Sequence, residues 1–411
     1  MPAPADGTIA AVRDWPPGTL FSPLSGAPLQ ACGPSVLAAG GEVWPVIEGI
    51  PFLRADRVRM ARAAVDLIEA GDIVAATALL LTDQDPYAPD PPPDIETCAR
   101  LVRDDACGFR EAMRRLAFGR VADYFAHRWT DPTYLSGLAL LGETRTRDTG
   151  RPVLELAAGV GHFLRAAARA GVEVVGADIV FAKLWLARRF VCPQARLVCF
   201  DAAVPWPLAE DAFAEAFCHD AFYFLPDKPG IAARMRRAVG ECGGIAIGHA
   251  HNALADNHSA GQPLTVDAYA ALFPGARLFD DRELTRAFAE GRPPEAAGLA
   301  TLATVPALSL VWHGGDPGRP DRRPGGGACC RFGDEADDAR LRLNPLYRRD
   351  GGRDGGEAAI VWPSPRYEQE YAALATYPMT WDGPDEIAAD RSAATQALIR
   401  RRVYVDLPPR W

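Results

Sequence analysis

The sequence predicts an α/β fold in which a doubly wound, mainly parallel sheet is joined to smaller elements at both ends of the chain. The first indication is a short apolar run that passes through a turn of small residues into an amphipathic helix, over residues 153–170. Further apolar runs, several of them separated by helical spacing, follow up to residue 252. Strands that alternate with helices are typical of parallel sheets. A length of 411 residues suits two or three folding units.

The turn after the first strand, residues 153–156, favours a ligand that lies close to the backbone. Gly159 and Gly161 lack the Cβ atoms with which such a ligand would collide. Glu155 suits hydroxyl or ammonium groups better than phosphate. The second strand, residues 172–178, ends in Asp178, and an acid at this place in doubly wound folds binds ribose hydroxyls. The pattern therefore predicts a nucleoside site.

Three later strands also end in polar residues. The strands are expected at residues 196–200, 213–218 and 243–248, and the polar residues that follow them are Asp201, His219, Asp220, His249 and His251. Ligands bind at the carboxyl ends of strands in open α/β sheets, so we expect these side chains at one edge. Residues 303–312 are apolar enough to form a late strand.

Residues 151–252 resemble class I S-adenosylmethionine-dependent methyltransferases. The segment from Glu155 to Gly161 matches the family's acid-x-Gly-x-Gly-x-Gly motif, with Ala157 in place of the first glycine. The resemblance implies a Rossmann-like sheet and S-adenosyl-L-methionine as the cofactor. Asp178 matches the acid that binds ribose, and Asp201 with Ala202 matches the pair that contacts adenine. The resemblance thus gives these cofactor-binding residues: Glu155, Ala157, Gly159, Gly161, Asp178, Ile179, Asp201, Ala202, Tyr124 and Arg128.

Tyr124 and Arg128 enter this set from a helical segment upstream of the first strand. In the family that the sequence resembles, a helix at this place commonly covers the cofactor. The methionine carboxylate needs a cation or hydroxyl donors, which Arg128 and Tyr124 supply. The alternative is an amphipathic helix whose aromatic rings pack and whose arginine is solvated.

The predicted chemistry is an in-line displacement at a sulfonium methyl group, helped by a general base where the acceptor is acidic. In the family, the methyl group points at the ends of the fourth and fifth strands. The catalytic candidates there are His219, His249, His251, Asp220 and Tyr223. Imidazoles titrate near neutral pH, so each histidine is a candidate base, and Asp220 is a candidate to orient one of them.

Two alternatives apply to the same residues. In one, His219 uses only its backbone and His251 lies at the surface. In the other, His219, Asp220, His249 and His251 hold a divalent metal ion, because a His-x-His pair at a strand end puts both rings on one face. The sequence places no further acid beside them, and we therefore predict no metal site.

The N-terminal segment resembles the small zinc-ribbon module of tRNA-methyltransferase activator proteins, through residues 20–29 and 45–51. That module has Cys-Pro-x-Cys where this chain has Ser22-Pro23-Leu24-Ser25, and only Cys32 lies nearby. Serine hydroxyls are poor zinc ligands, so no thiolate zinc site is expected. The segment is either a vestigial docking module or a packing appendage.

The predicted organisation has five parts. They are a degenerate ribbon-like β module at 1–56, a helical lid region at 57–145, the S-adenosylmethionine-binding core at 146–313, a linker at 314–328 and a C-terminal extension at 329–411. The linker is rich in Gly, Pro, Asp and Arg, with little to bury.

The composition of the chain limits which binding partners and which cellular location are expected. A formal charge of −9 disfavours nucleic acid, and no apolar stretch is long enough to span a membrane. The N-terminus has no signal-peptide pattern, so the expected location is the cytoplasm. Nine scattered cysteines give no disulfide framework.

These observations together predict methyl transfer to an oxygen or nitrogen atom of a small molecule, in natural-product or secondary metabolism. Three alternatives remain open: an RNA methyltransferase, an enzyme that uses the aminocarboxypropyl arm of the cofactor or cyclises its substrate, and a non-catalytic partner subunit.

Overall fold

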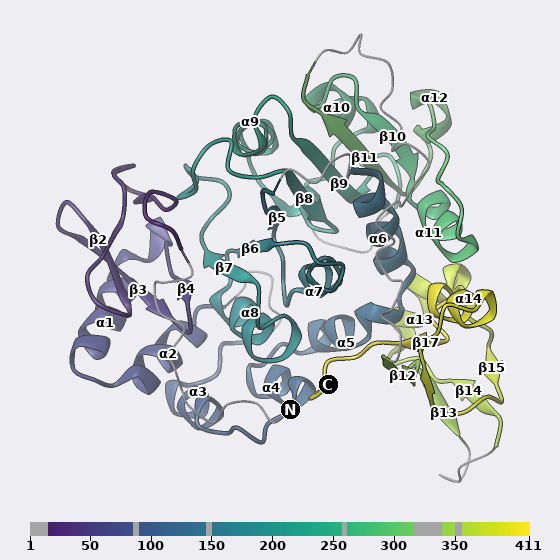
Figure 1. The fold of residues 1–411 in the computed structure, drawn as a ribbon, viewed down its shortest axis with the longest axis horizontal. Coiled ribbons are helices and arrows are strands. Elements are labelled where there is room, and N and C mark those ends of the chain that lie inside the picture. The colour runs from purple at the N-terminus through teal and green to yellow at the C-terminus, as the bar shows by residue number, and fades with distance from the viewer. Residues whose placement is uncertain (1–14, 85–89, 145–149, 257–260, 316–338, 350–355) are drawn as a thin grey trace.

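A seven-stranded sheet forms the centre of the structure, a computed structural model that describes residues 15–84, 90–144, 150–256, 261–315, 339–349 and 356–411 (Figure 1). The strand order is β10-β11-β9-β8-β5-β6-β7. All neighbours from β9 to β7 are parallel, whereas β11 runs antiparallel to both β9 and β10. The strands are β5 (Val153–Leu156), β6 (Val174–Asp178), β7 (Arg196–Cys199), β8 (Glu215–His219), β9 (Gly244–His251), β10 (Arg277–Asp280) and β11 (Ala307–His313).

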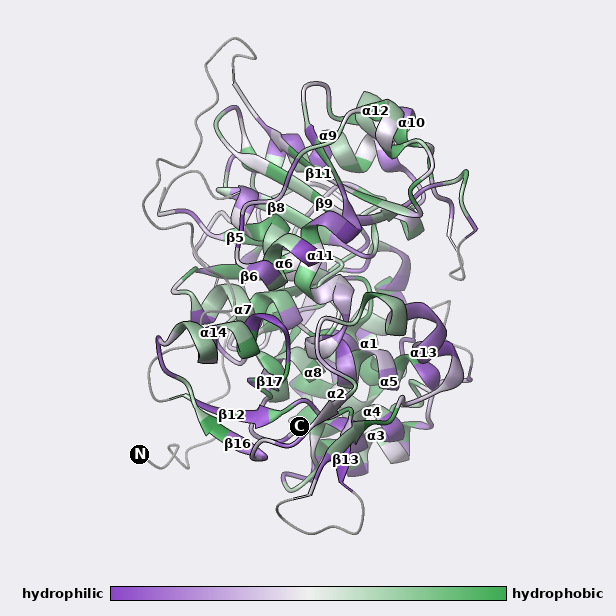
Figure 2. Cartoon of the chain, turned by 90° about the vertical axis from the view of Figure 1, so that its right-hand side faces the viewer, coloured by the Kyte–Doolittle hydropathy of each residue, from purple (hydrophilic) through white to green (hydrophobic). Residues whose placement is uncertain are grey.

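The predicted Rossmann-like α/β class is therefore confirmed. Strands β5, β6 and β8 are buried along their whole length, as expected for parallel strands covered on both faces. In Figure 2, by contrast, α13 is drawn largely in hydrophilic colours. Strand β10 was not expected from the sequence, since four residues that lead directly into a helix give little periodic signal.

The helices of the core follow their strands. They are α7 (His162–Arg169), α8 (Phe181–Leu186), a π-helical segment η4 (Ala187–Val191), α9 (Lys228–Val239), α10 (Val266–Leu272), α11 (Asp281–Glu290) and α12 (Leu299–Leu302). Helix α6 (Pro132–Thr144), which precedes the first strand, packs against α11, β9 and β11. This helix is therefore part of the core layer rather than only a cover.

A four-stranded antiparallel sheet forms the N-terminal module, with strands β1 (Gln30–Ala31), β2 (Val36–Ala39), β3 (Glu42–Ile47) and β4 (Ile50–Pro51). It adjoins the edge of the large sheet, because Phe52 forms a bridge with Cys199 and the Leu53 N–H donates to the Cys199 carbonyl at 2.7 Å. The hydroxyl of Ser22 accepts hydrogen bonds from the N–H groups of Leu24 and Ser25, both at 3.1 Å. The predicted small N-terminal β module is thus present.

Short helices connect this module to the core. They are η2 (Ala55–Arg57), α1 (Val58–Glu69), α2 (Ile73–Leu81), α3 (Ile95–Val102), α4 (Phe109–Arg115), α5 (Arg120–His127) and η3 (Arg128–Thr130). Gly71 lies between α1 and α2, and the Asp72 side chain caps α2 by accepting from the Ala75 N–H.

The C-terminal extension has its own small core around two three-stranded sheets. Its elements are β12 (Arg340–Leu343), β13 (Tyr347–Arg349), β14 (Ala358–Ile360), α13 (Pro365–Tyr371), η7 (Ala372–Leu374), β15 (Thr380–Trp381), β16 (Glu386–Ala388), α14 (Ala393–Arg400) and β17 (Tyr404–Val405). The last residues return to the core, where Asp406 pairs with Arg165 and the Trp411 indole donates to the Ala126 carbonyl. The predicted linker lies outside the described residues, apart from 314 and 315.

None of the helices in the described part of the chain has the length and apolar character needed to cross a bilayer.

Candidate functional site

The glycine bend between β5 and α7 has the shape that the sequence motif predicts. Ala157, Gly159 and Gly161 all have positive φ angles, of 55°, 56° and 87°. The Gly159 N–H donates to Asp178 Oδ2 at 2.9 Å, which ties the bend to the end of β6. A Cβ atom at Gly159 would lie 3.3 Å from the ring of Phe125 in α5. Helix α5 therefore packs over the bend.

Glu155 is a buried carboxylate at the end of β5, with only 5% of its surface exposed. Its Oε2 atom has no hydrogen-bond partner among the described residues. Burial raises the pKa of Glu155 well above its ordinary value, although the Leu164 N–H opposes this shift. A buried polar atom without a partner costs about 1–3 kcal/mol, and a hydroxyl or ammonium group of a ligand would satisfy it.

The other predicted cofactor residues lie at the carboxyl ends of β6 and β7. Asp178 Oδ1 accepts from the Val180 N–H at 2.9 Å, and the carbonyl of Ile179 accepts from Arg54. Asp201 Oδ1 accepts from the Ala203 N–H at 2.8 Å. The carbonyl of Ala202 accepts from the Trp206 indole at 3.0 Å, which places Trp206 at this end of the site. Parallel strands thus bring the four predicted residues to one edge of the sheet.

Tyr124 and Arg128 point at Asp220, the residue that follows β8. The Tyr124 hydroxyl donates to Asp220 Oδ2 at 2.7 Å, and Arg128 lies 3.0 Å from the same oxygen. Arg128 is 2% exposed and also contacts Asp131 and Thr133, so the solvated arginine of the alternative interpretation is wrong. Their predicted role toward a methionine carboxylate remains a prediction.

The hydrogen bonds of His219 argue that it is not a general base. Its Nδ1 lies 3.1 Å from the Arg128 guanidinium, which can only donate, so Nδ1 must accept. Its Nε2 lies 3.3 Å from Ser136 Oγ, whose own proton goes to the Thr133 carbonyl. Both ring nitrogens are therefore occupied in the neutral tautomer. Burial lowers the pKa of His219 to about 3, and the Arg128 charge adds to this effect.

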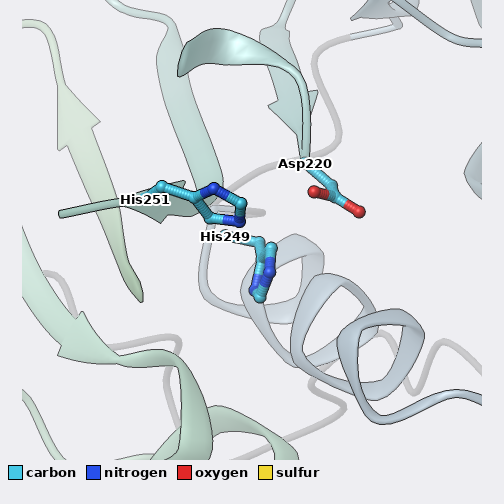
Figure 3. A group of neighbouring side chains, drawn as sticks. All are labelled: Asp220, His249 and His251. Atoms are coloured by element: carbon cyan, nitrogen blue, oxygen red, sulfur yellow. The ribbon is translucent and has the colours of Figure 1, made fainter. Parts of the chain in front are cut away.

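Asp220, His249 and His251 form a cluster at the ends of β8 and β9 (Figure 3). One ligand-type atom from each residue lies within 4.8 Å of the other two. Asp220 Oδ1 also accepts from the Tyr223 hydroxyl at 2.9 Å, and the Tyr223 ring stacks on His251 with 3.9 Å between centroids. Tyr223 belongs to the short helix η5 (Phe222–Phe224). The structure thus brings together four of the five predicted catalytic residues.

Two residues that the sequence analysis missed support this cluster. His249 Nδ1 lies 2.7 Å from Asp281 Oδ2, and the Ser309 hydroxyl donates to Asp281 Oδ1 at 2.9 Å. The His249 N–H in turn donates to Ser309 Oγ at 3.0 Å. Asp281 opens α11 and Ser309 lies in β11, so both are far from the motif in sequence. Asp281 follows the N-cap residue Asp280 in the first turn of α11, where acidic residues are common, so the pair carries no specific signal in the sequence.

Each member of the cluster has a distinct protonation state. Burial disfavours charge on His249, but Asp281 and Asp220 outweigh it and raise its pKa to about 9. Burial lowers the pKa of His251 to about 4, so this imidazole is neutral at pH 7. Burial would raise the pKa of Asp220, but the charges of His249 and Arg128 bring it below its usual range. A neutral imidazole beside a carboxylate can accept either a proton or a metal ion.

Comparisons with known proteins address the core. Residues 153–243 match the family model of a methyltransferase domain. No match is found among curated proteins.

Several solved structures are similar to part of the chain at low identity. A phosphoethanolamine N-methyltransferase 2 of Haemonchus contortus is 16% identical over 51% of this chain and 61% of its own, with a TM-score of 0.36. A SAM-dependent methyltransferase from Thermotoga maritima is 11% identical over 49% of this chain and 96% of its own, with a TM-score of 0.33. A chain from a complex that contains the Trm112 methyltransferase activator of Haloferax volcanii is 16% identical over 50% of this chain and 94% of its own, with a TM-score of 0.33.

The chain spans about three fifths of the length of the first of these proteins, 61%. The matched residues include the glycine bend, Glu155, Asp178 and His219. Residues 153–243 therefore match a methyltransferase domain, which lies on a Rossmann-like sheet, and S-adenosylmethionine is the cofactor that this match supports.

Proposed function

We propose that this protein transfers the methyl group of S-adenosylmethionine to an oxygen or nitrogen atom of a small molecule. The observation that carries the proposal is the meeting of two sets of residues at one edge of the sheet. Glu155 and Asp178 lie at the glycine bend, and the cluster of Asp220, His249 and His251 lies at the neighbouring strands β8 and β9.

The first set would hold the cofactor. The unpaired oxygen of Glu155 would accept from a ligand donor, and the Asp178 carboxylate would accept from the ribose hydroxyls. Tyr124 and Arg128 would reach the methionine end from α5 and η3, beside Asp220.

The second set would align the acceptor and handle its proton. Methyl transfer moves the methyl carbon from sulfur to the acceptor atom, and alignment lowers the barrier without a covalent contribution from the enzyme. Tyr371 of the C-terminal extension lies close enough to this region for Asp131 and Asp220 to raise its pKa further, beyond the effect of burial. The extension would therefore cover the acceptor side.

The secondary-metabolism role and the cytoplasmic location belong to this proposal. The positive charge expected of a nucleic-acid binder is absent, since the formal net charge of the chain is −9, which supports a small acceptor.

Calorimetry with S-adenosylmethionine tests the cofactor half. The full chain should bind one molecule, and Asp178→Ala should abolish binding while Glu210→Gln, at an exposed carboxylate, should leave it unchanged. Absence of binding by the unmodified protein would contradict the proposal and favour a non-catalytic subunit.

Product analysis tests the reaction. Incubation with a panel of small phenols and amines should release S-adenosylhomocysteine. Release of methylthioadenosine would indicate transfer of the aminocarboxypropyl arm instead.

A further inference from the structure

We propose that Asp220, His249 and His251 bind one divalent transition-metal ion. The residues converge from two strand ends, with one ligand-type atom of each within 4.8 Å of the others (Figure 3). Within the described residues, no other group of three His, Cys, Asp or Glu side chains meets this condition.

The ligand types indicate which ion would bind. Two imidazoles and one carboxylate suit Zn²⁺ or Fe²⁺, whereas Mg²⁺ and Ca²⁺ prefer oxygen ligands. Ligand atoms in a tetrahedral site lie about 3.4 Å apart, since each is about 2.1 Å from the ion. Side-chain rotations that move each ligand atom by about 1 Å would therefore bring the three atoms to this spacing around an ion.

The surroundings of His249 resemble the support that metal-binding histidines have. Its Nδ1 faces the Asp281 carboxylate at 2.7 Å, so an ion would bind at Nε2, where it would replace the proton of the charged ring. The Ser309 hydroxyl fixes the other Asp281 oxygen at 2.9 Å. A carboxylate behind a ligating histidine sets its tautomer and its orientation.

The backbone is strained at two of the three proposed ligands. Asp220 has φ of 54° and His249 has φ of 48°, in the left-handed region that is unfavourable for a residue with a Cβ atom. The register of β9 and β11 shifts between Leu308 and Leu310, opposite Gly248 and His249. Such bulges re-aim side chains next to functional sites. Strain of this kind persists where the surrounding structure enforces it.

Asp220 is also prepared to act as an anionic ligand. Every group that bonds to its carboxylate is a donor: Tyr124, Tyr223 and Arg128. These donors hold the carboxylate in place and favour its ionised form.

Three protein ligands leave coordination positions open for an acceptor. This use of the ion, unlike its binding, rests on the proposed function. An acceptor hydroxyl bound to the ion would lose its proton to solvent more readily. The resulting oxygen would form the new C–O bond as the S–CH₃ bond breaks, and sulfur would keep the electron pair as S-adenosylhomocysteine leaves.

Metal titration of the full chain tests the site. Cys32 and Cys242, which are exposed in the described part of the chain, are first replaced by serine together with Cys329 and Cys330, which lie outside it, so that none of these thiols binds the probe. After chelator treatment, calorimetry with ZnCl₂ should show one ion per chain. Asp281→Asn should weaken binding by about 10–100-fold, as loss of such a support does. His251→Ala should weaken it further, and His313→Ala, at an exposed histidine at the far end of β11, should not.

A second measurement needs no site variant. Co²⁺ added to the chelator-treated protein should give the visible d–d bands of nitrogen and oxygen ligation, without a thiolate charge-transfer band. Absence of stoichiometric Zn²⁺ or Co²⁺ binding would overturn the proposal, as would binding that His251→Ala leaves unchanged. S-adenosylmethionine binding is measured on the same samples: metal binding without cofactor binding would overturn the proposed function alone.

Discussion

Replacing Ala157 by glycine should stabilise the protein. This residue stands where the family motif has its first glycine, and its φ of +55° lies in the left-handed region. The Cβ atom of an L-residue there collides with the following carbonyl oxygen. The bend keeps its shape despite the alanine, which means that the surrounding structure bears the strain.

The expected gain is the difference between two effects. Relief of the left-handed conformation is worth about 1–2 kcal/mol. The added freedom of glycine in the unfolded chain takes back about 0.4–1 kcal/mol. Ala157→Gly should therefore raise the free energy of unfolding by about 0.5–1 kcal/mol, and the melting temperature by about 1 °C for a protein of this size.

Calorimetric melting with a matched control checks this reasoning. Ala158→Gly makes the same chemical change one residue later, at a buried alanine without a positive φ, and should destabilise the protein by about 1 kcal/mol. If Ala157→Gly destabilised the protein as much as the control does, the strain at this bend would be refuted.

Three more changes have defined outcomes. Burial lowers the pKa of His162 to about 3, so the unfolded chain binds this proton more readily and stability should fall as the pH drops below about 6.5. His162→Gln keeps a donor at the place of Nε2 but has no titrating ring, so the loss of unfolding free energy between about pH 7 and pH 5, measured in urea titrations, should be smaller. An unchanged loss between these two pH values would contradict a buried neutral ring. Gly248→Ala would put a Cβ atom 2.1 Å from the His219 ring, so it should cost about 1–3 kcal/mol in urea unfolding, and a neutral result would exclude this packing. Arg128→Met would leave Asp220 without its buried cation and should cost about 3–5 kcal/mol, whereas a smaller loss in thermal unfolding would mean that the charge is compensated elsewhere.

The core of the fold was predictable because its signals are local. Apolar runs such as Val153–Leu156 are buried on both faces, and each ends at a residue that breaks the strand. Helix ends were also readable, as at Asp72, where a side chain caps the next helix. The position of α6 was not predictable from the sequence, because its apolar surface fits either a lid or a core layer. Only its contacts with α11 and β9 decide between them.

The location of the candidate site at the strand ends was predictable from the sequence, but the protonation states and roles of its residues were not. The three histidines lie at the strand ends, as expected, but neighbours that are distant in sequence give each imidazole a different protonation state. Arg128 and Ser136 make His219 a neutral acceptor and donor with no nitrogen to spare. Asp281 gives His249 an anionic neighbour, 32 residues away in the chain, that no motif contains.

Because the three histidines have different neighbours, His219 is excluded as a base, and His249 and His251 form a candidate metal site with Asp220. The metal alternative included Asp220 but had no further acid beside the histidine pair, and the fold supplies one in Asp281. Asp220 faces the pair from the end of β8, and Asp281 stands behind His249 from α11. A carboxylate as ligand and another as support are the two features that a histidine pair alone lacks. Because both arise from packing of β8, β9 and α11, a variant that removes Asp281 tests the arrangement without touching a ligand.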